Sequence, residues 1–219
     1  MTMFARLRQA AGEDWRGYVE HEFLAALADG SLPEKCFRHY LVQDYLFLIQ
    51  FARAYALAVY KSDTLAEMRS AAATMAGILD VEMKLHVGFC ARWGLSEADM
   101  ERQPEAAATV AYTRYVLDRG MAGDLLDLRV ALAPCVIGYS EIGARLLGNA
   151  RLDGNPYRAW IEMYGGTEYQ AVAQAAISTL DDSALRRGGD ARFAALAQSF
   201  VTASRLEADF WQMALDAAG

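Results

Sequence analysis

The segment from Tyr40 to Tyr60 limits the folds open to this chain more than any other stretch. From Tyr45 to Ile49 every residue is apolar or aromatic, so a helix here would have no polar face to turn toward water. We therefore expect a central helix that is buried on all sides. Upstream, Ser31-Leu32-Pro33-Glu34 has the pattern of a capping box with proline at the first helical position, which predicts where this helix begins.

Other segments with helical spacing can cover this central helix. Ala and Leu dominate the sequence, and only 4 of its 219 residues are proline, which favours an all-α fold. The pattern predicts further helices over about 2–28, 64–92, 105–118, 156–164, 168–179 and 190–217, one through Cys135 that ends near Gly148, and a short one after Ser96. We expect Asp63 to cap the helix over 64–92, a polar loop over 181–189, and a single domain over 1–219.

The charge balance and the cysteines exclude several classes of protein. The net charge of −7 argues against a nucleic-acid partner. No apolar run reaches membrane-spanning length without a charged or polar break, and the N-terminal residues lack the apolar region and cleavage site of an export signal. Cys36, Cys90 and Cys135 are too scattered for a disulfide framework or a zinc site, so a reducing cytoplasm is the expected location.

A lone cysteine lies beside a proline in the middle of an apolar helical run, in the segment Ala133-Pro134-Cys135-Val136-Ile137-Gly138-Tyr139. Pro134 removes the donor for the carbonyl of Val130, which is expected to kink the helix and open room beside Cys135. Tyr139 shares a face with Cys135 because it lies four residues further on. We expect Cys135 to be a nucleophile at the floor of a pocket.

Asp44 borders the aromatic part of the central helix. Tyr40, Phe47 and Phe51 lie at helical spacing on the same side as Asp44, which places a carboxylate among aromatic rings. This arrangement suits a flat ligand with ring nitrogens or an amino group. The alternative is that Asp44 bonds a tyrosine hydroxyl or a neighbouring helix terminus, because a buried carboxylate needs a partner. Gln43 beside it favours the functional interpretation, since it does not suit an apolar core either.

Glu207 interrupts the apolar stripe of the last helix. Its neighbours on that face are Phe200, Phe210 and Trp211. Burial disfavours the charged form of a carboxyl group and raises its pKa, so Glu207 is a candidate proton donor and acceptor near neutral pH. A structural pairing with a tyrosine is the alternative.

Glu82 and His86 interrupt another apolar stripe, four residues apart. This is the spacing of a helical carboxylate–imidazole metal pair, which leaves a metal-dependent oxidase as an alternative function. We prefer a structural hydrogen-bonded pair, because a di-metal site needs more ligands and the chain has only three histidines. Of the other two, His21 could be a haem ligand, but a helix-surface or core role is the preferred interpretation, and His39 lies near it in the sequence.

The chain resembles the TenA family of aminopyrimidine hydrolases, also called thiaminase II, over nearly its whole length. The similarity rests on several separate motifs in the same order: His21-Glu22-Phe23-Leu24 through Gly30-Ser31-Leu32-Pro33, Phe37-Arg38-His39-Tyr40-Leu41-Val42-Gln43-Asp44-Tyr45-Leu46, Pro134-Cys135 with Tyr139 and Ile142-Gly143, Trp160-Ile161 with Tyr164, and Glu207 with Phe210-Trp211-Gln212-Met213-Ala214. The presence of Cys135 indicates the cysteine-containing branch of that family.

This resemblance implies a haem-oxygenase-like helical fold, usually a homotetramer, with no metal or haem cofactor. It implies that Cys135 adds to the pyrimidine ring of a small-molecule substrate, while Glu207 protonates a ring nitrogen and later manages the water. The leaving group on the exocyclic methylene would be the thiazolium of thiamin or an amine, in thiamin salvage or degradation. The implied substrate contacts are Asp44 on the amidine edge, Phe47 packed on the ring, and Tyr112, Tyr139 and Tyr164. A pyrimidine-binding or regulatory protein without turnover is the non-enzymatic alternative.

Overall fold

The computed structural model describes residues 1–217, and these residues form helices and connecting loops without a strand. The elements in chain order are α1 (Met3–Val19), α2 (Glu22–Asp29), α3 (Glu34–Lys61), α4 (Leu65–Gly77), the π-helical turn η1 (Ile78–Glu82), α5 (Met83–Ala91), α6 (Glu97–Glu101), α7 (Ala107–Ala122), α8 (Leu125–Asn149), α9 (Arg158–Gly165), α10 (Thr167–Arg186) and α11 (Phe193–Asp216). The prediction of an all-α fold is confirmed.

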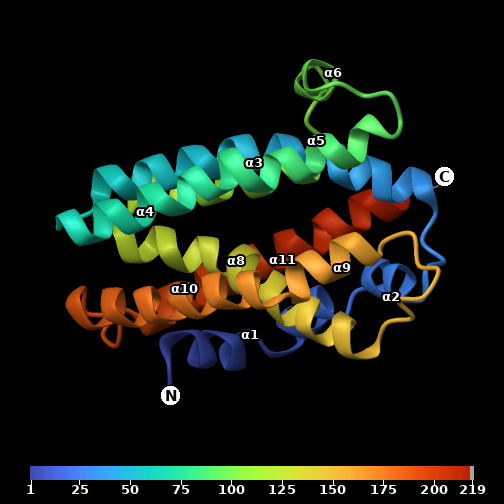
Figure 1. Cartoon of the computed structure of the whole chain (residues 1–219). Coiled ribbons are helices and arrows are strands. Elements are labelled where there is room, and N and C mark those ends of the chain that lie inside the picture. Colours follow the sequence, from blue (N-terminus) through green and yellow to red (C-terminus); the bar gives the residue numbers. More distant parts are fainter. Residues whose placement is uncertain (218–219) are drawn as a thin grey trace.

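The helices form two layers (Figure 1). In this view α3, α4, α5 and α7 lie in the upper layer, and α8, α9, α10 and α11 lie below them, with α1 along the underside. The layers meet where α3 and α7 contact α8 and α11. The candidate site residues come from both layers, so the packing between the layers positions the site.

The central helix is α3, and its middle is buried on all sides as expected. Every residue from Tyr40 to Leu48 is buried. Gln43, which does not suit an apolar core, is explained by its hydrogen bonds. Its Nε2 donates to the carbonyl of Pro104 (3.0 Å), and its Oε1 accepts from the amide of Ala106 (2.8 Å) and the hydroxyl of Thr109 (2.7 Å). Gln43 therefore fixes the beginning of α7 against α3 and does not support a ligand-binding role.

Two sequence predictions about helix starts are wrong. The expected capping box before α3 does not form, because Pro33 is the N-cap and makes no side-chain cap bond. The expected long first helix is two helices, broken where Nδ1 of His21 accepts a hydrogen bond from the amide of Phe23 (3.2 Å) and caps α2. The expected end at Gly30 is confirmed, since this glycine has φ of 81° in the left-handed region.

The expected helix over 64–92 is continuous but not regular. Thr64 caps it in place of Asp63, with its Oγ1 accepting from the amide of Glu67 at 3.2 Å. In its middle, the backbone widens into the π-helical turn η1, which ends at Glu82. A π-helical turn holds one residue more than an α-helical turn, and the same residue types occur in both. The spacing of apolar residues in the sequence therefore does not reveal it.

The polar loop expected over 181–189 is largely helical, because α10 continues to Arg186. Its polar side chains are used in contacts with other helices. For example, Arg186 pairs with Glu67 of α4 at 2.6 Å. Ion pairs between helices thus stabilise the last turn of α10, where the polar sequence alone predicts a loop.

α8 continues as a helix through Pro134 and ends at Asn149, near the expected position. Among the described residues it is the one helix long and apolar enough to cross a membrane, and 72% of its most apolar window is buried inside the bundle. Glu141 and Arg145 interrupt its apolar sequence, in agreement with the expected charged or polar break, and its burial is that of a core helix. Tyr18 approaches it closely, donating from its hydroxyl to the carbonyl of Pro134 (3.2 Å). A Cβ on Gly138 would lie 2.5 Å from the Tyr18 ring.

Candidate active site

Cys135 and three carboxyl groups share one region of the protein. The half-buried thiol of Cys135 has its pKa raised well above its ordinary value, first by burial and then by the carboxyls of Glu207, Glu82 and Asp44. These residues come from α8, α11, η1 and α3, so both layers contribute. A thiol in this environment is protonated in the free protein at neutral pH.

Glu207 is the most buried of these carboxyl groups, with 2% of the residue exposed. The hydroxyl of Tyr112 donates to its Oε1 at 2.9 Å. Burial raises the pKa of Glu207 to about 8, although the hydrogen bond from Tyr112 acts in the opposite direction. The carboxyl is therefore mostly protonated at neutral pH, which is the state needed to donate a proton to a ligand.

Asp44 is held by two donors on one of its oxygens. Its Oδ2 accepts from the Tyr40 hydroxyl at 3.0 Å and lies 2.6 Å from Nε2 of His86. The other ring nitrogen of His86 lies 2.9 Å from the carbonyl of Glu82. A carbonyl only accepts hydrogen bonds, so Nδ1 carries a proton. The carboxylate of Asp44 and the backbone of Glu82 raise the pKa of His86 against the effect of burial, and the imidazolium form donates from both nitrogens.

The structure thus shows the partners of Asp44, Glu82 and His86. Asp44 does bond a tyrosine hydroxyl, and it also pairs with His86, which the sequence analysis had not connected to it. His86 and Glu82 are linked through the Glu82 backbone carbonyl and not as a side-chain pair. Both imidazole nitrogens are therefore engaged, and residues 1–217 contain no group of three or more His, Cys, Asp or Glu placed to hold a metal ion.

Four aromatic residues expected at the site lie around these groups. Phe47 stacks on Tyr112 with ring centroids 5.1 Å apart, on the side of Glu207. Tyr139 lies 4.9 Å from the ring of Tyr164. The Tyr164 hydroxyl donates to Oε1 of Glu82 at 3.0 Å. The structure therefore brings all seven expected site residues, Cys135, Glu207, Asp44, Phe47, Tyr112, Tyr139 and Tyr164, into one cluster with Glu82 and His86.

Two tyrosines that the sequence analysis did not select belong to the same region of the protein. Cys135 contributes to the raised pKa of both Tyr55 and Tyr169, and Tyr169 lies 4.9 Å from the ring of Tyr164. Tyr55 packs on Phe51 at 5.4 Å. It continues the helical spacing of Tyr40, Asp44, Phe47 and Phe51, and this signal would have identified it. Tyr169 lies in no comparable pattern.

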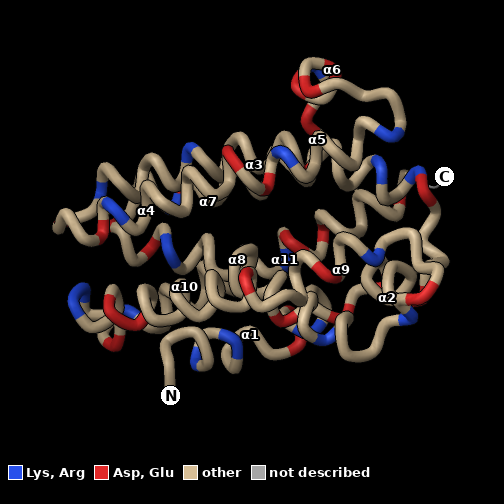
Figure 2. Tube along the Cα trace, viewed as in Figure 1, with Lys and Arg blue, Asp and Glu red and all other residues tan. Residues whose placement is uncertain are grey.

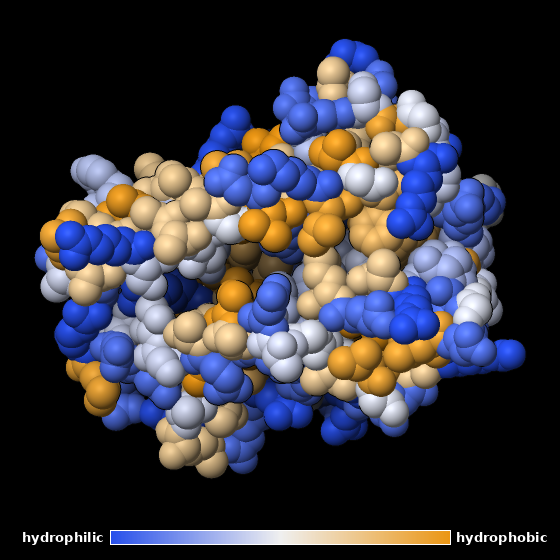
Figure 3. Space-filling view, in the orientation of Figure 1, coloured by the Kyte–Doolittle hydropathy of each residue, from blue (hydrophilic) through white to orange (hydrophobic). Residues whose placement is uncertain are grey.

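The cluster has an inner and an outer part. Asp44 and Glu207 are 4% and 2% exposed, whereas Cys135, Glu82, Tyr55 and Tyr169 retain intermediate exposure. The face seen in Figure 3 is hollowed near its centre, between α4–α5 and α10, with apolar residues along the rim. Cys135, Glu82, Tyr55 and Tyr169 are therefore the part of the cluster that is accessible to solvent.

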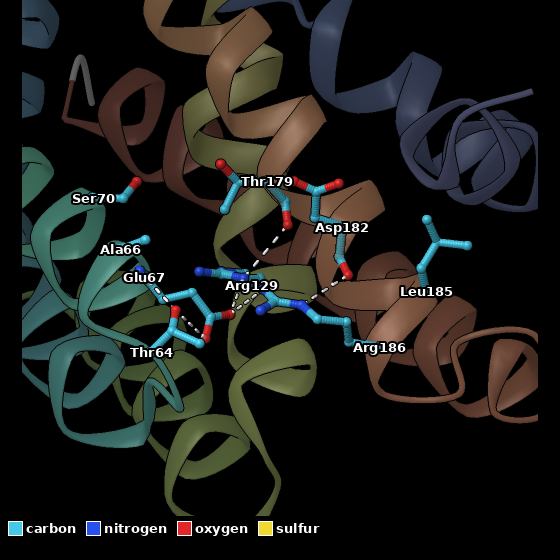
Figure 4. A pocket seen from close by; sticks show the side chains of 9 residues that line it. All are labelled: Thr64, Ala66, Glu67, Ser70, Arg129, Thr179, Asp182, Leu185 and Arg186. Carbon is cyan, nitrogen blue, oxygen red and sulfur yellow. Dashed lines mark hydrogen bonds and ion pairs between the residues drawn. The ribbon is translucent and has the colours of Figure 1, made fainter.

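A cavity of about 430 Å³ at one end of the bundle is a separate feature (Figure 4). There, Glu67 lies 3.4 Å from Arg129, 2.6 Å from Arg186 and 3.2 Å from Arg187. Acidic and basic positions meet at this end, where α4 and α8 begin and α10 ends (Figure 2). Through these contacts Glu67 joins α4 to α8 and α10, and none of the expected site residues lines this cavity.

A second cavity of about 550 Å³ is bordered by Lys35, Arg38, His39 and Gln43, and neither Cys135 nor Glu207 lines it. Neither cavity therefore changes the assignment of the candidate site to the cluster around Cys135.

Comparison with known proteins finds relatives that match nearly the whole chain. The sequence model of the TENA/THI-4/PQQC family matches residues 8–217. The aminopyrimidine aminohydrolase of Halalkalibacterium halodurans is 37% identical over 98% of this chain and 96% of that protein. The enzyme of the same name from Bacillus subtilis is 31% identical over 98% and 90%.

A crystal structure from Silicibacter sp. TM1040, described as a TenA family transcription regulator, is 47% identical with a TM-score of 0.93, over 97% of this chain and 96% of that chain. Two relatives are thus described as enzymes and one as a regulator. The described helices have the haem-oxygenase-like arrangement of TenA proteins. The chain belongs to the TENA/THI-4/PQQC family.

Proposed function

We propose that this protein is an aminopyrimidine aminohydrolase of the thiaminase II type, acting at the exocyclic methylene of a 4-amino-2-methylpyrimidine. The observation that carries the proposal is the convergence of a thiol, Cys135, and a carboxyl group with a pKa of about 8, Glu207, on one site. Relatives at 37% and 31% identity are named for this activity. The assignment follows from the site chemistry and the names together.

Substrate binding would begin at Asp44. Its Oδ2 already accepts from Tyr40 and His86, and no group in residues 1–217 bonds Oδ1. The free oxygen would accept from the 4-amino group on the amidine edge of the ring. Phe47, Tyr112, Tyr139 and Tyr164 would supply ring packing and further polar contacts.

Covalent catalysis would follow from the acid and the thiol. The sulfur of Cys135 would form a bond to a ring carbon, while the electrons of the attacked double bond move to the adjacent ring nitrogen. Glu207 would give that nitrogen its proton and receive the proton of the thiol, so protons and charge balance. Asp44 would stabilise the positive charge that develops on the amidine edge.

Addition would then expel the leaving group. The amino-substituted double bond would shift to form an exocyclic methylene as the bond to the leaving nitrogen breaks, and the electron pair would depart with that nitrogen. Water would add to the methylene, and its extra proton would pass to solvent. The bond from the ring carbon to sulfur would then break, while Glu207 gives its proton to the sulfur and takes the proton from the ring nitrogen. This restores the aromatic hydroxymethylpyrimidine and the free enzyme.

We further infer that the protein works in the cytoplasm as a homotetramer of the cysteine-containing TenA branch, in thiamin salvage or degradation. The three free cysteines support a reducing compartment. The acidic net charge of −7 argues against nucleic acid as a partner. The burial of α8 inside the bundle accounts for its apolar sequence without a membrane.

A regulatory protein that binds a pyrimidine without turnover is the second candidate, because the Silicibacter relative is described as a transcription regulator. The two candidates differ in what Glu207 does. A regulator would bind the same ligand with Glu207→Gln unchanged in affinity and would release no product.

The deciding experiment incubates the protein with 4-amino-5-aminomethyl-2-methylpyrimidine and, separately, with thiamin. Release of hydroxymethylpyrimidine by the wild type, and its loss by at least about 1000-fold in Cys135→Ala, is expected for a nucleophile. Cys90→Ala, which alters a buried cysteine elsewhere, serves as the control. Equal turnover by Cys135→Ala and the wild type would contradict covalent catalysis, and saturable binding without product would favour the regulator.

A further inference from the structure

Glu82 is the carboxyl group near Cys135 that the proposed mechanism does not use. Asp44 and Glu207 each have a role on the pyrimidine ring. Within residues 1–217, the side chain of Glu82 accepts one hydrogen bond, from the hydroxyl of Tyr164 at 3.0 Å. A carboxylate can accept about four hydrogen bonds, so most of its capacity is open to a ligand.

The fold holds Glu82 in place. It is the last residue of η1, and π-helical turns inside α-helices occur frequently at functional sites. His86 bonds its backbone carbonyl at 2.9 Å, and Tyr164 bonds its carboxylate. Backbone and side chain are thus both fixed by residues that contact the candidate site.

Three further groups share the accessible side of the site with Glu82. Tyr55, Tyr169 and Cys135 all retain intermediate exposure. Neither the Tyr55 nor the Tyr169 hydroxyl has a hydrogen-bond partner among the described residues, and neither is a fully buried atom. Tyr164 contacts both Glu82, at 3.0 Å, and the ring of Tyr169, at 4.9 Å. We use the name outer chamber for the half-exposed side of the site that carries Glu82, Tyr55, Tyr169 and Cys135.

The outer chamber lies where a leaving group would project. With the amidine edge at Asp44, the ring would fill the inner part of the site, which is 4% exposed at Asp44 and 2% at Glu207. The substituent on the exocyclic methylene is the variable part of the substrate and would extend past Cys135 toward solvent. A leaving group there would meet one carboxylate and two phenol rings.

We propose that the outer chamber binds the leaving group and that Glu82 makes the enzyme selective for leaving groups that carry a positive charge. This inference rests on the proposed function and adds the substrate class. The carboxylate would attract the cation, and the Tyr55 and Tyr169 rings would add cation–π contacts. Without such groups, nothing in the site would compensate the free-energy cost of removing the cation from water.

The charge requirement agrees with the chemistry of departure. An amine leaves as a neutral molecule only if the nitrogen is already protonated, because the electron pair of the broken bond stays on it. A thiazolium likewise leaves as a neutral thiazole. In both cases the positive charge that Glu82 holds disappears from the leaving group, so the product loses its main attraction and can dissociate.

The test compares a cationic with a neutral leaving group in Glu82→Gln. The cationic substrate is 4-amino-5-aminomethyl-2-methylpyrimidine. The neutral one is the hydroxymethyl product, whose hydroxyl exchanges with ¹⁸O-labelled water through the same Cys135 adduct. Asp80→Asn is the matched control, because it removes one exposed negative charge from the same π-helical turn. Thermal melts of each variant report folding.

In Glu82→Gln we expect kcat/KM for the aminomethyl substrate to fall about 10- to 100-fold, mainly through KM, which corresponds to loss of one charged hydrogen bond. The ¹⁸O exchange should stay within about threefold of wild type, and Asp80→Asn should change neither. Equal losses in both assays, or no loss in either, would overturn the role of Glu82. Absence of both reactions in the wild type would contradict the proposed function itself and this inference with it.

Discussion

Nε2 of His86 lies 2.6 Å from Oδ2 of Asp44, and the two side chains are 1% and 6% exposed. The pair joins α5 to α3 across the upper layer and keeps one oxygen of Asp44 occupied. The other oxygen, Oδ1, has no hydrogen-bond partner among residues 1–217. A buried pair of this kind is strongly coupled, because either partner alone would be left in the interior without compensation.

Replacement of His86 should expose this coupling. We expect His86→Leu to lower the free energy of unfolding by about 3–5 kcal/mol, since a buried carboxylate loses its partner. Adding Asp44→Asn should recover part of that loss. Urea denaturation of the two single variants and the double variant measures the coupling, and additive effects would show that the residues act independently.

The raised pKa of Glu207 predicts a pH-dependent stability difference. The folded state binds the proton more tightly than the unfolded state, whose carboxyl titrates near 4.5. Stability from this group is therefore complete below about pH 4.5 and is lost as pH rises toward 8. Glu207→Gln has no titrating carboxyl group at this position. As the pH rises from 5 to 9, its free energy of unfolding should therefore increase by about 3–5 kcal/mol relative to that of the wild type.

Denaturant melts at several pH values test this difference. Asp209→Asn, on the exposed face of the same helix, should follow the wild-type curve. Parallel curves for Glu207→Gln and wild type would show that Glu207 has an ordinary pKa.

The hydrogen bond from Tyr112 should tune the acid. It acts to lower the pKa of Glu207, so Tyr112→Phe should raise that pKa further. The basic limb of the kcat/KM profile would then move by about 0.5–1 pH unit to higher pH. Tyr115→Phe is the control, because its hydroxyl donates to the Ser199 carbonyl at 3.2 Å. A basic limb that stays fixed in Tyr112→Phe would exclude Glu207 as its source.

Two glycines of α8 should respond oppositely to alanine. A Cβ on Gly138 would lie 2.5 Å from the Tyr18 ring, whereas a Cβ on Gly148 meets nothing within 4 Å. Gly138→Ala should therefore destabilise by about 1–3 kcal/mol or more, and Gly148→Ala should stabilise by about 0.5–1 kcal/mol. Calorimetric melting temperatures distinguish the two, and a neutral Gly138→Ala would mean that Tyr18 can move away.

The sequence predicted the helices and much of the cluster for a physical reason. Helical spacing reports which face is buried, and it placed Asp44 and Glu207 on apolar faces correctly. Their partners could not be derived this way. His86 is on another helix from Asp44, and only the packing of α5 on α3 brings them together.

The local irregularities of the helices also could not be predicted from the sequence. The break at His21 depends on a ring nitrogen that caps α2, and the continuation of α10 depends on ion pairs with Glu67. The cap at His21 is a local side-chain contact that competes with continuation of the helix, whereas the ion pair that continues α10 is a long-range contact. The π-helical turn at Glu82 is a third irregularity, and it positions the residue on which the substrate preference is proposed to depend.

α11, the helix that carries Glu207, also packs against residues from the amino-terminal end of the chain. Phe4 and Trp15 pack on Phe200 with ring centroids 6.0 Å and 5.3 Å away, and Arg205 pairs with Asp14 at 2.7 Å. Shortening the protein at its amino end would therefore uncover an aromatic strip on α11, with aggregation as the expected result. An affinity tag is better joined ahead of Met1, whose side chain is exposed, than substituted for the residues that follow it.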